Sequence, residues 1–377
     1  MSSSTLPVNL DRLLAACIAQ HGSDLHLSPG LPQHIRIHGD LAPLEGEAVC
    51  SGEDIGNLAA ELIRRMNGDS GPAPLQVPGG SLDGAVTAPG GVRFRFNVFR
   101  RQSEMALALR RLEDRFRSLA ELGLPESLRQ LCDLRDGLVV VSGPTGAGKS
   151  TTLATLLDHV NRTRLGHIIT IEDPIEYIHK PVRCVVNQRQ VGLDTPGFNE
   201  ALVASLRQDP DVVLVGEIRD LETIRTAITA AETGHLVFTT LHAGDCVGSI
   251  ERLVSVFPSD EQEGIRRQLA LVLRGIVAQR LLPAVPNGQA QRRVAVSEIL
   301  ISTPAIANLI ATGKSAQIYS TIETGTSLGM QTLEQDLARL WFSGRISETT
   351  ALAMARNTHV LRDRVAMLRR PKNGGGE

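Results

Sequence analysis

The sequence predicts an α/β protein of two units, a small α+β unit followed by a larger unit in which strands alternate with helices. The chain has 377 residues, more than one ordinary hydrophobic core accommodates, which indicates two domains or three. Near residue 112 the pattern changes from short strands with connections rich in Gly and Pro to apolar runs of strand length separated by helix-forming segments. The second pattern is typical of a parallel sheet covered by helices.

The first unit is expected to span residues 1–112. Apolar residues at helical spacing predict a helix over Leu10–Gln20, which stops at His21-Gly22, and a second helix over Asp54–Met66. The segment Gly68–Gly91 is rich in Gly and Pro and should contain one strand at most. The expected strands are Asp24–Leu27, His34–His38, Leu82–Thr87, Val92–Phe99 and Ala106–Leu112.

Residues 113–118 are expected to form a linker, because they begin with the charged run Glu113-Asp114-Arg115, and the second unit should span residues 119–360. From Pro304 onward the pattern is mostly helical, and residues 361–377 are predicted to be a basic, flexible tail. The strands expected in the second unit are Gly137–Val141, His167–Ile171, Val212–Val215 and Leu236–Thr240, and its clearest helices are Lys149–Asn161, Phe198–Arg207 and Leu221–Glu232.

Composition disfavours several classes of function. The formal charge of −2 supplies no excess of cations for nucleic acid, and an aromatic content of 3% supplies no platform for stacking bases. The five cysteines are scattered without a C-x-x-C pair, which argues against a zinc site and favours a reducing compartment. The N-terminus has no signal-peptide pattern, and the apolar runs are too short to cross a bilayer. We therefore expect a cytoplasmic protein without membrane insertion or bound nucleic acid.

A phosphate-binding loop is the clearest motif of the sequence. Gly143-Pro-Thr-Gly-Ala-Gly-Lys-Ser150 matches G-x-x-x-x-G-K-[ST], with an apolar strand before it and a helix-forming segment after it. Lys149 should reach the β- and γ-phosphates of ATP, and the Ser150 hydroxyl should bind Mg²⁺. The residues expected to contact the nucleotide are Gly143, Pro144, Thr145, Gly146, Ala147, Gly148, Lys149, Ser150 and Thr151.

Two acidic motifs follow, each at the end of an expected strand. Glu172-Asp173-Pro174-Ile175-Glu176 comes after the first strand, and Glu217 ends the apolar run that begins at Asp211, as in a Walker-B motif. The carboxyl ends of parallel strands meet beside the phosphate loop. One carboxylate can therefore complete the Mg²⁺ site while another deprotonates water. We favour Glu217 for the metal and Glu172 as general base, although the sequence leaves the assignment open.

Two histidines flank the next expected strand, His235 before it and His242 after it. A neutral imidazole near a γ-phosphate can sense hydrolysis through a hydrogen bond. A histidine at a strand end is nevertheless more often a structural residue, so the two histidines are weak candidates by themselves.

Together these motifs resemble those of the type IV pilus retraction ATPases, the PilT/PilU group of the secretion ATPase superfamily. The resemblance runs from about residue 10 to about residue 355. The remaining motifs that carry it are Gly22-Ser-Asp-Leu-His-Leu27, Arg36-Ile-His-Gly39, Arg93-Phe-Arg-Phe-Asn97, Asn187-Gln-Arg189, Arg207-Gln-Asp-Pro-Asp211, Gly216-Glu-Ile-Arg-Asp220, Thr233-Gly-His235, Thr240-Leu-His242 and Gly329-Met-Gln-Thr-Leu333.

The resemblance implies a PAS-like N-terminal domain joined to a RecA-like P-loop ATPase domain with a helical C-terminal region. It also implies a homohexameric ring at the cytoplasmic side of the inner membrane. There an inner-membrane pilus platform protein, and a paralogous retraction ATPase, would be its partners. Carried over to this sequence, Glu172, Asp173 and Glu176 form the Asp box, Glu217 is the Walker-B acid, and His235 and His242 form the His box.

One segment departs from the family pattern. Where the family has Ala-Ile-Arg-Asn-Leu-Ile-Arg-Glu, this chain has Ala305-Ile-Ala-Asn-Leu-Ile-Ala-Thr312, without either arginine or the acid. A pilus assembly or type II secretion ATPase is the nearest rival, but such proteins carry a four-cysteine zinc motif that this sequence lacks. A weakly hydrolysing, PilU-like accessory partner is the second alternative.

Arginines form the last group of candidates. The pattern over Val92–Phe99 places Arg93 and Arg95 on one strand face opposite Phe94 and Phe96. In a ring ATPase an arginine from a neighbouring subunit can stabilise charge on the γ-phosphate. The candidates for this role are Arg93, Arg95, Arg100 and Arg101, together with Arg207 or Arg219.

Overall fold

The computed structural model describes residues 8–37, 40–47, 49–66, 68, 77, 80–112, 115–286 and 293–369. The chain forms two compact units. The first comprises residues up to Arg115 together with Pro174–Ile178, and the second comprises Phe116–Asp173 and the chain from His179 onward. Four expected features lie wholly or partly outside the described residues: His38 and Gly39 of an expected strand and motif, residues 69–76, 78 and 79 of the segment rich in Gly and Pro, Glu113 and Asp114 of the linker, and the tail from residue 370.

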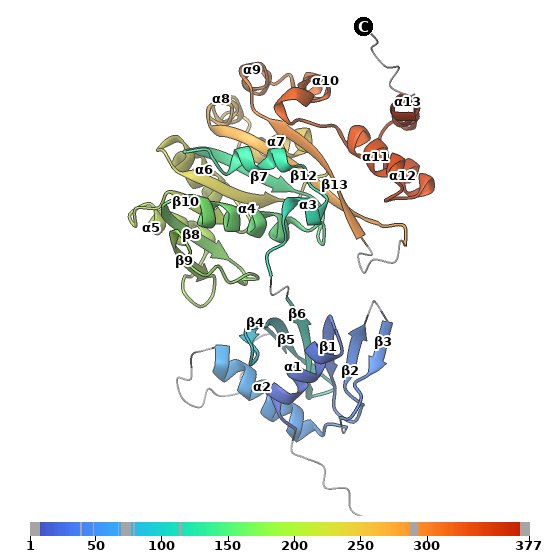
Figure 1. Ribbon diagram of the computed structural model, residues 1–377. Helices are drawn as coiled ribbons and strands as arrows, with labels where there is room; N and C mark the ends of the chain where they lie inside the picture. The colour runs from blue at the N-terminus through green and yellow to red at the C-terminus, as the bar shows by residue number, and fades with distance from the viewer. Residues whose placement is uncertain are drawn as a thin grey trace, which may run out of the picture. The chain divides into compact units, whose positions relative to one another are not determined.

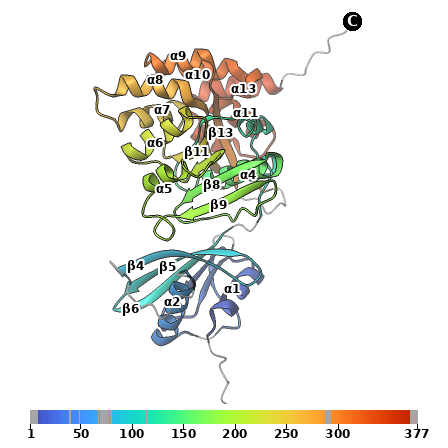
Figure 2. The ribbon, with the colours of Figure 1, turned by 90° about the vertical axis from the view of Figure 1, so that its left-hand side faces the viewer.

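The first unit contains a six-stranded antiparallel sheet in the order β3-β2-β1-β6-β5-β4, with its two helices packed on one face (Figure 2). Apolar side chains from both helices and the sheet form one core. All five expected strands are present, and β3 is an addition. The elements are α1 (Leu10–Ala19), β1 (Asp24–Leu27), β2 (His34–Ile37), β3 (Asp40–Pro43), α2 (Gly52–Met66), β4 (Ser81–Thr87), β5 (Arg93–Arg101) and β6 (Glu104–Arg111).

Strand β5 alternates between the core and the other face of the sheet. Phe94 and Phe96 are buried, whereas Arg95 is exposed and Arg93 is half-buried. The expected alternation is confirmed. The guanidinium groups of these two arginines therefore belong to the sheet face that α1 and α2 leave uncovered.

The second unit is built on a seven-stranded sheet in the order β13-β12-β7-β11-β10-β8-β9 (Figure 1). Six strands are parallel, and β13 pairs antiparallel with β12. The expected parallel sheet is therefore present, and β13 adds one antiparallel strand at this edge. The strands are β7 (Gly137–Ser142), β8 (Gly166–Glu172), β9 (Cys184–Gln190), β10 (Val212–Val215), β11 (Leu236–Leu241), β12 (Leu273–Pro283) and β13 (Arg293–Ile301).

Helices cover both faces of this sheet. Along β7, Leu138 and Val140 pack into a core with α5 to α8, whereas Val139 and Val141 face the opposite way, into a core with α4. A strand buried on both faces explains the uninterrupted apolar run in its sequence. The helices are α3 (Leu119–Leu122), α4 (Lys149–Thr163), α5 (Phe198–Ser205), α6 (Leu221–Glu232), α7 (Cys246–Ser255) and α8 (Gln262–Val272).

The C-terminal region is helical, as expected, but the predicted flexible tail begins too early. Residues up to Arg369 continue a helix, because Leu361 and Val365 are buried against α11 and its neighbours. Charge obscured this amphipathic pattern in the sequence. The C-terminal helices are α9 (Pro304–Ala311), α10 (Ile318–Thr324), α11 (Leu333–Phe342), α12 (Glu348–Met354) and α13 (Thr358–Arg369).

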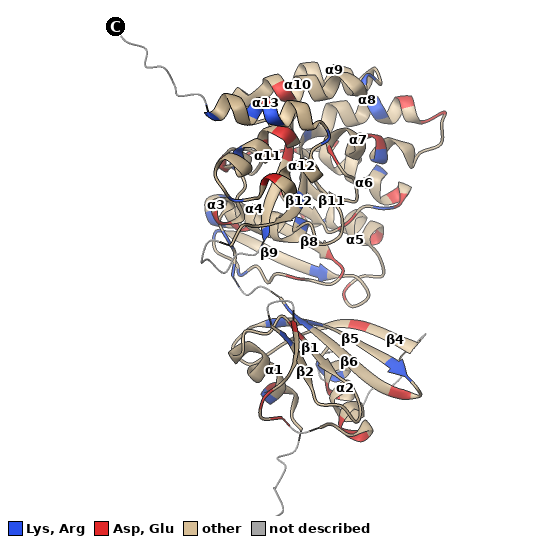
Figure 3. Cartoon of the chain, turned by 90° about the vertical axis from the view of Figure 1, so that its right-hand side faces the viewer, with Lys and Arg blue, Asp and Glu red and all other residues tan. Residues whose placement is uncertain are grey.

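Acidic and basic residues are interspersed over the elements of both units (Figure 3). Within the ranges that the structure covers, no helix is both long enough and apolar enough to cross a membrane.

Candidate functional site

The carboxyl edge of the large sheet brings the phosphate loop and the two acidic motifs together. Strand β7 runs into the loop, and the neighbouring β11 and β10 end at the same level, because Thr239 pairs with both Val140 and Val215. Backbone bonds continue across this edge. The amide of Gly143 donates to Leu241 (3.2 Å), and the amide of Gly216 donates to Ile171 (2.8 Å). Glu172 and Glu217 therefore follow adjacent strands, β8 and β10, as the sequence predicts.

The loop has the geometry of an anion cradle. Gly146 and Gly148 have φ angles of 77° and 88°, a left-handed conformation that glycine adopts without strain. Helix α4 begins at Lys149, and no side chain within the described chain caps its N-terminus. Because α4 follows the loop directly, the partial positive charge of its N-terminus lies beside the loop. Lys149 Nζ donates to the carbonyl oxygens of Gly143 (2.9 Å) and Pro144 (3.2 Å), so the ammonium group lies close to the first two residues of the loop.

The remaining loop residues differ in exposure. Gly143 and Ala147 are buried, because they form the side of the loop that packs against the sheet. Lys149 and Thr151 are half-buried on the first turn of α4. The exposed residues of the loop are Pro144, Thr145, Gly146 and Ser150.

Glu217 is the centre of a charged cluster. Its side chain is 20% exposed, and Arg219 Nη2 donates to its Oε2 at 2.6 Å. His242 Nε2 lies 3.2 Å from its Oε1. The hydrogen bond to the carboxylate raises the pKa of Arg219 above its usual value, with a further contribution from the charge on Glu217. Arg219 and His242 thus both contact Glu217, and either side chain could bond to a phosphate oxygen in place of this carboxylate.

Glu172, at the end of β8, is held by neutral donors. Thr170 Oγ1 donates to its Oε1 at 2.7 Å, and Gln188 Nε2 donates to the same oxygen at 3.1 Å. These two hydrogen bonds fix the orientation of the carboxylate at the end of the strand. Asp173 is exposed beside it, whereas Glu176 belongs to the segment that groups with the first unit.

Two expected catalytic residues lie at the opposite, amino edge of this sheet. His235 precedes β11, and its Nδ1 lies 2.9 Å from the carbonyl oxygen of Ala230. Its own carbonyl accepts from Gly137, the first residue of β7. Arg207 follows α5 and is exposed before β10 begins. Within one subunit neither residue joins the phosphate loop, because a full strand length separates the two edges.

Sequence reasoning missed Gln279, a buried residue of β12 that contacts the loop directly. Its amide bonds to Ala147 and to Thr152, and both partners belong to the loop or to the first turn of α4. No signal in the sequence marked it, since β12 itself was not predicted. Helix α8 passes into β12 between Val272 and Leu273 without a Gly or Pro to mark the boundary.

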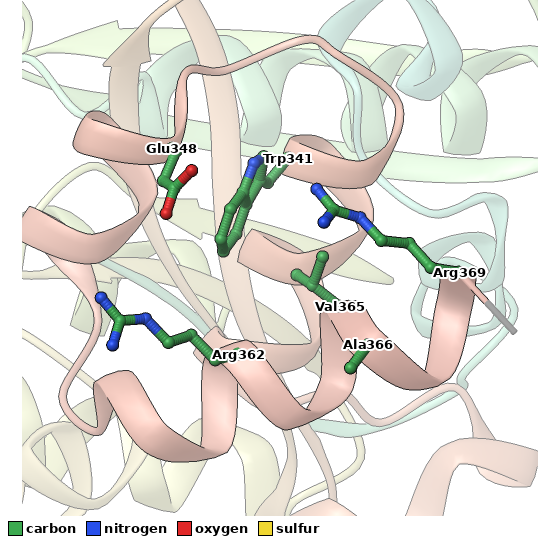
Figure 4. Close-up of a pocket in the computed structure, with 6 residues that line it drawn as sticks. All are labelled: Trp341, Glu348, Arg362, Val365, Ala366 and Arg369. Atoms are coloured by element: carbon green, nitrogen blue, oxygen red, sulfur yellow. The ribbon is translucent and has the colours of Figure 1, made fainter.

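A surface cavity lies elsewhere in the second unit, among α11, α12 and α13 (Figure 4). None of the residues around it was predicted as a site residue, so it has no part in the arrangement at the sheet edge. Its lining residues are Trp341, Glu348, Arg362, Val365, Ala366 and Arg369.

Comparison with known proteins agrees with this geometry. Residues 9–341 match the model of the family described as type II/IV secretion system protein. The chain is 45% identical over 354 residues to the type IV pilus retractation ATPase PilT of Pseudomonas aeruginosa, covering 93% of this chain and 98% of that protein. It is 38% identical to the type IV pilus ATPase PilU of the same species, over 94% of this chain and 91% of the relative.

A solved structure supports the same assignment. The crystal structure of the pilus retraction motor PilT with bound ADP superimposes with a TM-score of 0.84 at 39% identity. The superposition covers 94% of this chain and 99% of the other. The expected resemblance is therefore confirmed in sequence and in fold. The chain belongs to the type II/IV secretion system protein family and, within it, to the pilus retraction ATPases of the PilT/PilU group.

Proposed function

We propose that the carboxyl edge of the large sheet is the site where this ATPase binds and hydrolyses Mg-ATP. The observation that carries the proposal is the convergence of Lys149 and Glu217 on one sheet edge, beside the uncapped N-terminus of α4. A helix N-terminus, backbone amides and one lysine form the arrangement that binds the phosphates of a nucleotide.

Each residue of the edge has a role in this proposal. Lys149 exchanges its carbonyl partners for the β- and γ-phosphates, while backbone amides of the segment from Thr145 to Thr151 surround them. The exposed Ser150 hydroxyl and the Glu217 carboxylate are oxygen donors of the kind that Mg²⁺ prefers, so these residues fit the metal. When bound, Mg²⁺ supplies charge neutralisation at the phosphates. Glu172 accepts the proton of the attacking water, and His242 links Glu217 to the γ-phosphate position.

The mechanical function follows from the relatives. PilT is named as a pilus retraction motor and PilU as a pilus ATPase, and both are covered along nearly their whole length. We therefore propose that this protein drives retraction of a type IV pilus as a homohexamer. In this proposal the ring works in the cytoplasm, against an inner-membrane platform protein. A paralogous retraction ATPase is a further proposed partner.

A specific observation keeps the accessory role as a second candidate. Helix α9 carries Ala307 and Ala311 where the family motif has arginines, so this helix presents no charge for a partner at these positions. An accessory subunit would bind ATP through the same loop but would turn it over only weakly. Lys149, Glu172 and Glu217 are all present at the sheet edge, which favours the motor.

Phosphate release by the purified protein, measured together with its ring state, tests the two candidates. A motor should release phosphate continuously once rings form, without any other protein. Tight ATP binding with scarcely any release from assembled rings would favour the accessory role. Phosphate release that begins only when a paralogous ATPase is added would point the same way.

A further inference from the structure

Gln279 is a buried polar residue for which the proposed reaction has not yet accounted. It lies on β12 directly after Ala278, which pairs with Ser142, the last residue of β7. Its side chain is therefore level with the beginning of the phosphate loop. Only 3% of the residue is exposed, so its amide needs partners within the protein.

Both ends of the Gln279 side-chain amide form hydrogen bonds, one as a donor and the other as an acceptor. Nε2 donates to the carbonyl oxygen of Ala147 at 2.7 Å. Oε1 accepts from the Thr152 hydroxyl, also at 2.7 Å, and Thr152 is fully buried on α4. The side chain thus ties the far side of the loop to the first turn of the helix that follows.

The bond to Ala147 fixes more than one carbonyl group. In a trans peptide the C=O and the following N–H point in opposite directions across one rigid plane. With the carbonyl of Ala147 held toward Gln279, the amide N–H of Gly148 points away from β12, toward the interior of the loop. Amides that point inward are what a phosphate-binding loop offers its ligand.

We propose that Gln279 is a positioning residue that holds the Ala147–Gly148 peptide in the orientation required for binding the phosphates of a nucleoside diphosphate. Gln279 itself does not touch the phosphates. It acts through the loop, which it keeps in a binding shape when no nucleotide is present. This inference rests on the proposed nucleotide site and adds a residue to it.

The glycines of the loop agree with such close support. A Cβ on Gly143 would lie 2.2 Å from the backbone oxygen of Gln279, and one on Gly148 would lie 2.9 Å from its Nε2. The loop is therefore packed directly on this residue, with no room for a side chain between them. A rotation of the Ala147–Gly148 peptide would break the bond to Nε2 and leave a buried amide unpaired.

The test compares ADP affinity of full-length variants by isothermal titration calorimetry. Gln279→Met removes the donor without adding charge, and we expect the dissociation constant to rise about tenfold or more, from loss of one buried hydrogen bond. Gln279→Glu keeps the acceptor for Thr152 but sets a carboxylate against the Ala147 carbonyl. Burial raises the pKa of an introduced carboxyl. The ADP affinity of the Gln279→Glu variant should therefore recover toward that of the unmodified protein as pH falls, since the protonated carboxyl again donates to the carbonyl oxygen of Ala147.

Two further variants separate the possible causes. Gln33→Glu alters a buried glutamine of the first unit and controls for the general cost of burying an acid. It should lower thermal stability without changing ADP affinity. Lys149→Ala tests the site itself. If Lys149→Ala leaves ADP affinity intact, the proposed nucleotide site fails. If Lys149→Ala weakens binding but folded Gln279→Met binds within about twofold of the unmodified protein, the role of Gln279 alone is wrong.

Thr152→Val provides a second test if the Gln279→Met variant does not fold. It frees the Oε1 end of the amide, which lets the side chain turn away from Ala147. We expect a severalfold loss of ADP affinity with a smaller loss of stability. Unchanged affinity in this variant, together with no pH-dependent recovery in Gln279→Glu, would overturn the proposal.

Discussion

The two edges of the seven-stranded sheet differ in what their histidines contact. At the carboxyl edge, Glu217 is bonded to other charged or titratable side chains, Arg219 and His242. At the amino edge, His235 and His167 meet the backbone oxygens of Ala230 and Gln208 and the neutral side chains of Thr233 and Asn187. At the amino edge these contacts join the ends of helices and loops to the strands. Bonds between charged side chains can be exchanged for those to a ligand.

The contrast teaches that residues of one sequence motif need not share a site. His235 and His242 are seven residues apart, and an extended strand of that length spans roughly 20 Å. Strand β11 therefore carries them to opposite edges of the sheet. His242 reaches Glu217, whereas His235 fastens the end of α6 to the start of β11. The expected sensing role thus fits His242 within one subunit and does not fit His235.

The largest effect is expected at the loop. Lys149→Ala removes the only positive charge that the loop itself contributes, so hydrolysis should fall about a hundredfold or more through loss of a transition-state contact. Steady-state phosphate release measures it. Arg207→Ala at the amino edge is the comparison, and in dilute, unassembled protein it should have a far smaller effect. Near-normal turnover in folded Lys149→Ala would place catalysis elsewhere.

The next prediction divides the work between the two acids. Glu172→Gln and Glu217→Gln preserve shape and remove charge, and each should slow the chemical step by about a hundredfold while nucleotide still binds. If Glu172 is the general base, its variant binds Mg-ATP normally, and the Glu217 variant loses magnesium dependence. A magnesium titration that gives the reverse pattern would mean that the two roles are exchanged.

A smaller difference is expected between the histidines, and it tests the comparison of edges itself. His242→Ala removes a partner of Glu217 and should lower turnover about tenfold, as expected for a hydrogen bond to a charged group. His235→Ala removes a bond to a backbone carbonyl, so it should chiefly lower the thermal midpoint. Equal losses of turnover in dilute protein, with equal stability, would show that the amino edge takes part in chemistry within the subunit.

The arginines should give the smallest single effects, because Arg93, Arg95, Arg100 and Arg101 all lie on one strand, outside the carboxyl edge. If one of them acts across a subunit boundary, turnover per subunit rises with protein concentration. Mixing its alanine variant with Lys149→Ala subunits should then restore activity at interfaces that pair an intact loop with an intact arginine. Full turnover in rings of every single variant would leave the strand as a solvated face. Arg207→Ala and Arg219→Ala belong in the same series.

Much of this arrangement is predictable from local pattern. The strand, loop and helix around Lys149 are marked by glycines and an apolar run, and α6 matches its expected bounds, with Asp220 capping its first turn. Strands β9, β12 and β13 were not predicted, and for β12 the reason is that no Gly or Pro separates it from α8. Because β12 was not predicted, Gln279 could not be placed beside the loop. The position of His235 at the amino edge, by contrast, follows from the sequence, because His235 precedes an expected strand of the parallel sheet.

A structure of the protein with Mg²⁺ and a non-hydrolysable ATP analogue tests the central claim most directly. The claim is that the carboxyl edge alone forms the nucleotide site within a subunit. It predicts phosphates enclosed by backbone amides of residues 145–151, with Lys149 Nζ moved from the carbonyl oxygen of Gly143 to the β- and γ-phosphates and Glu217 facing the metal. Phosphates bound at the amino edge of the same subunit, near His235 or Arg207, would contradict it.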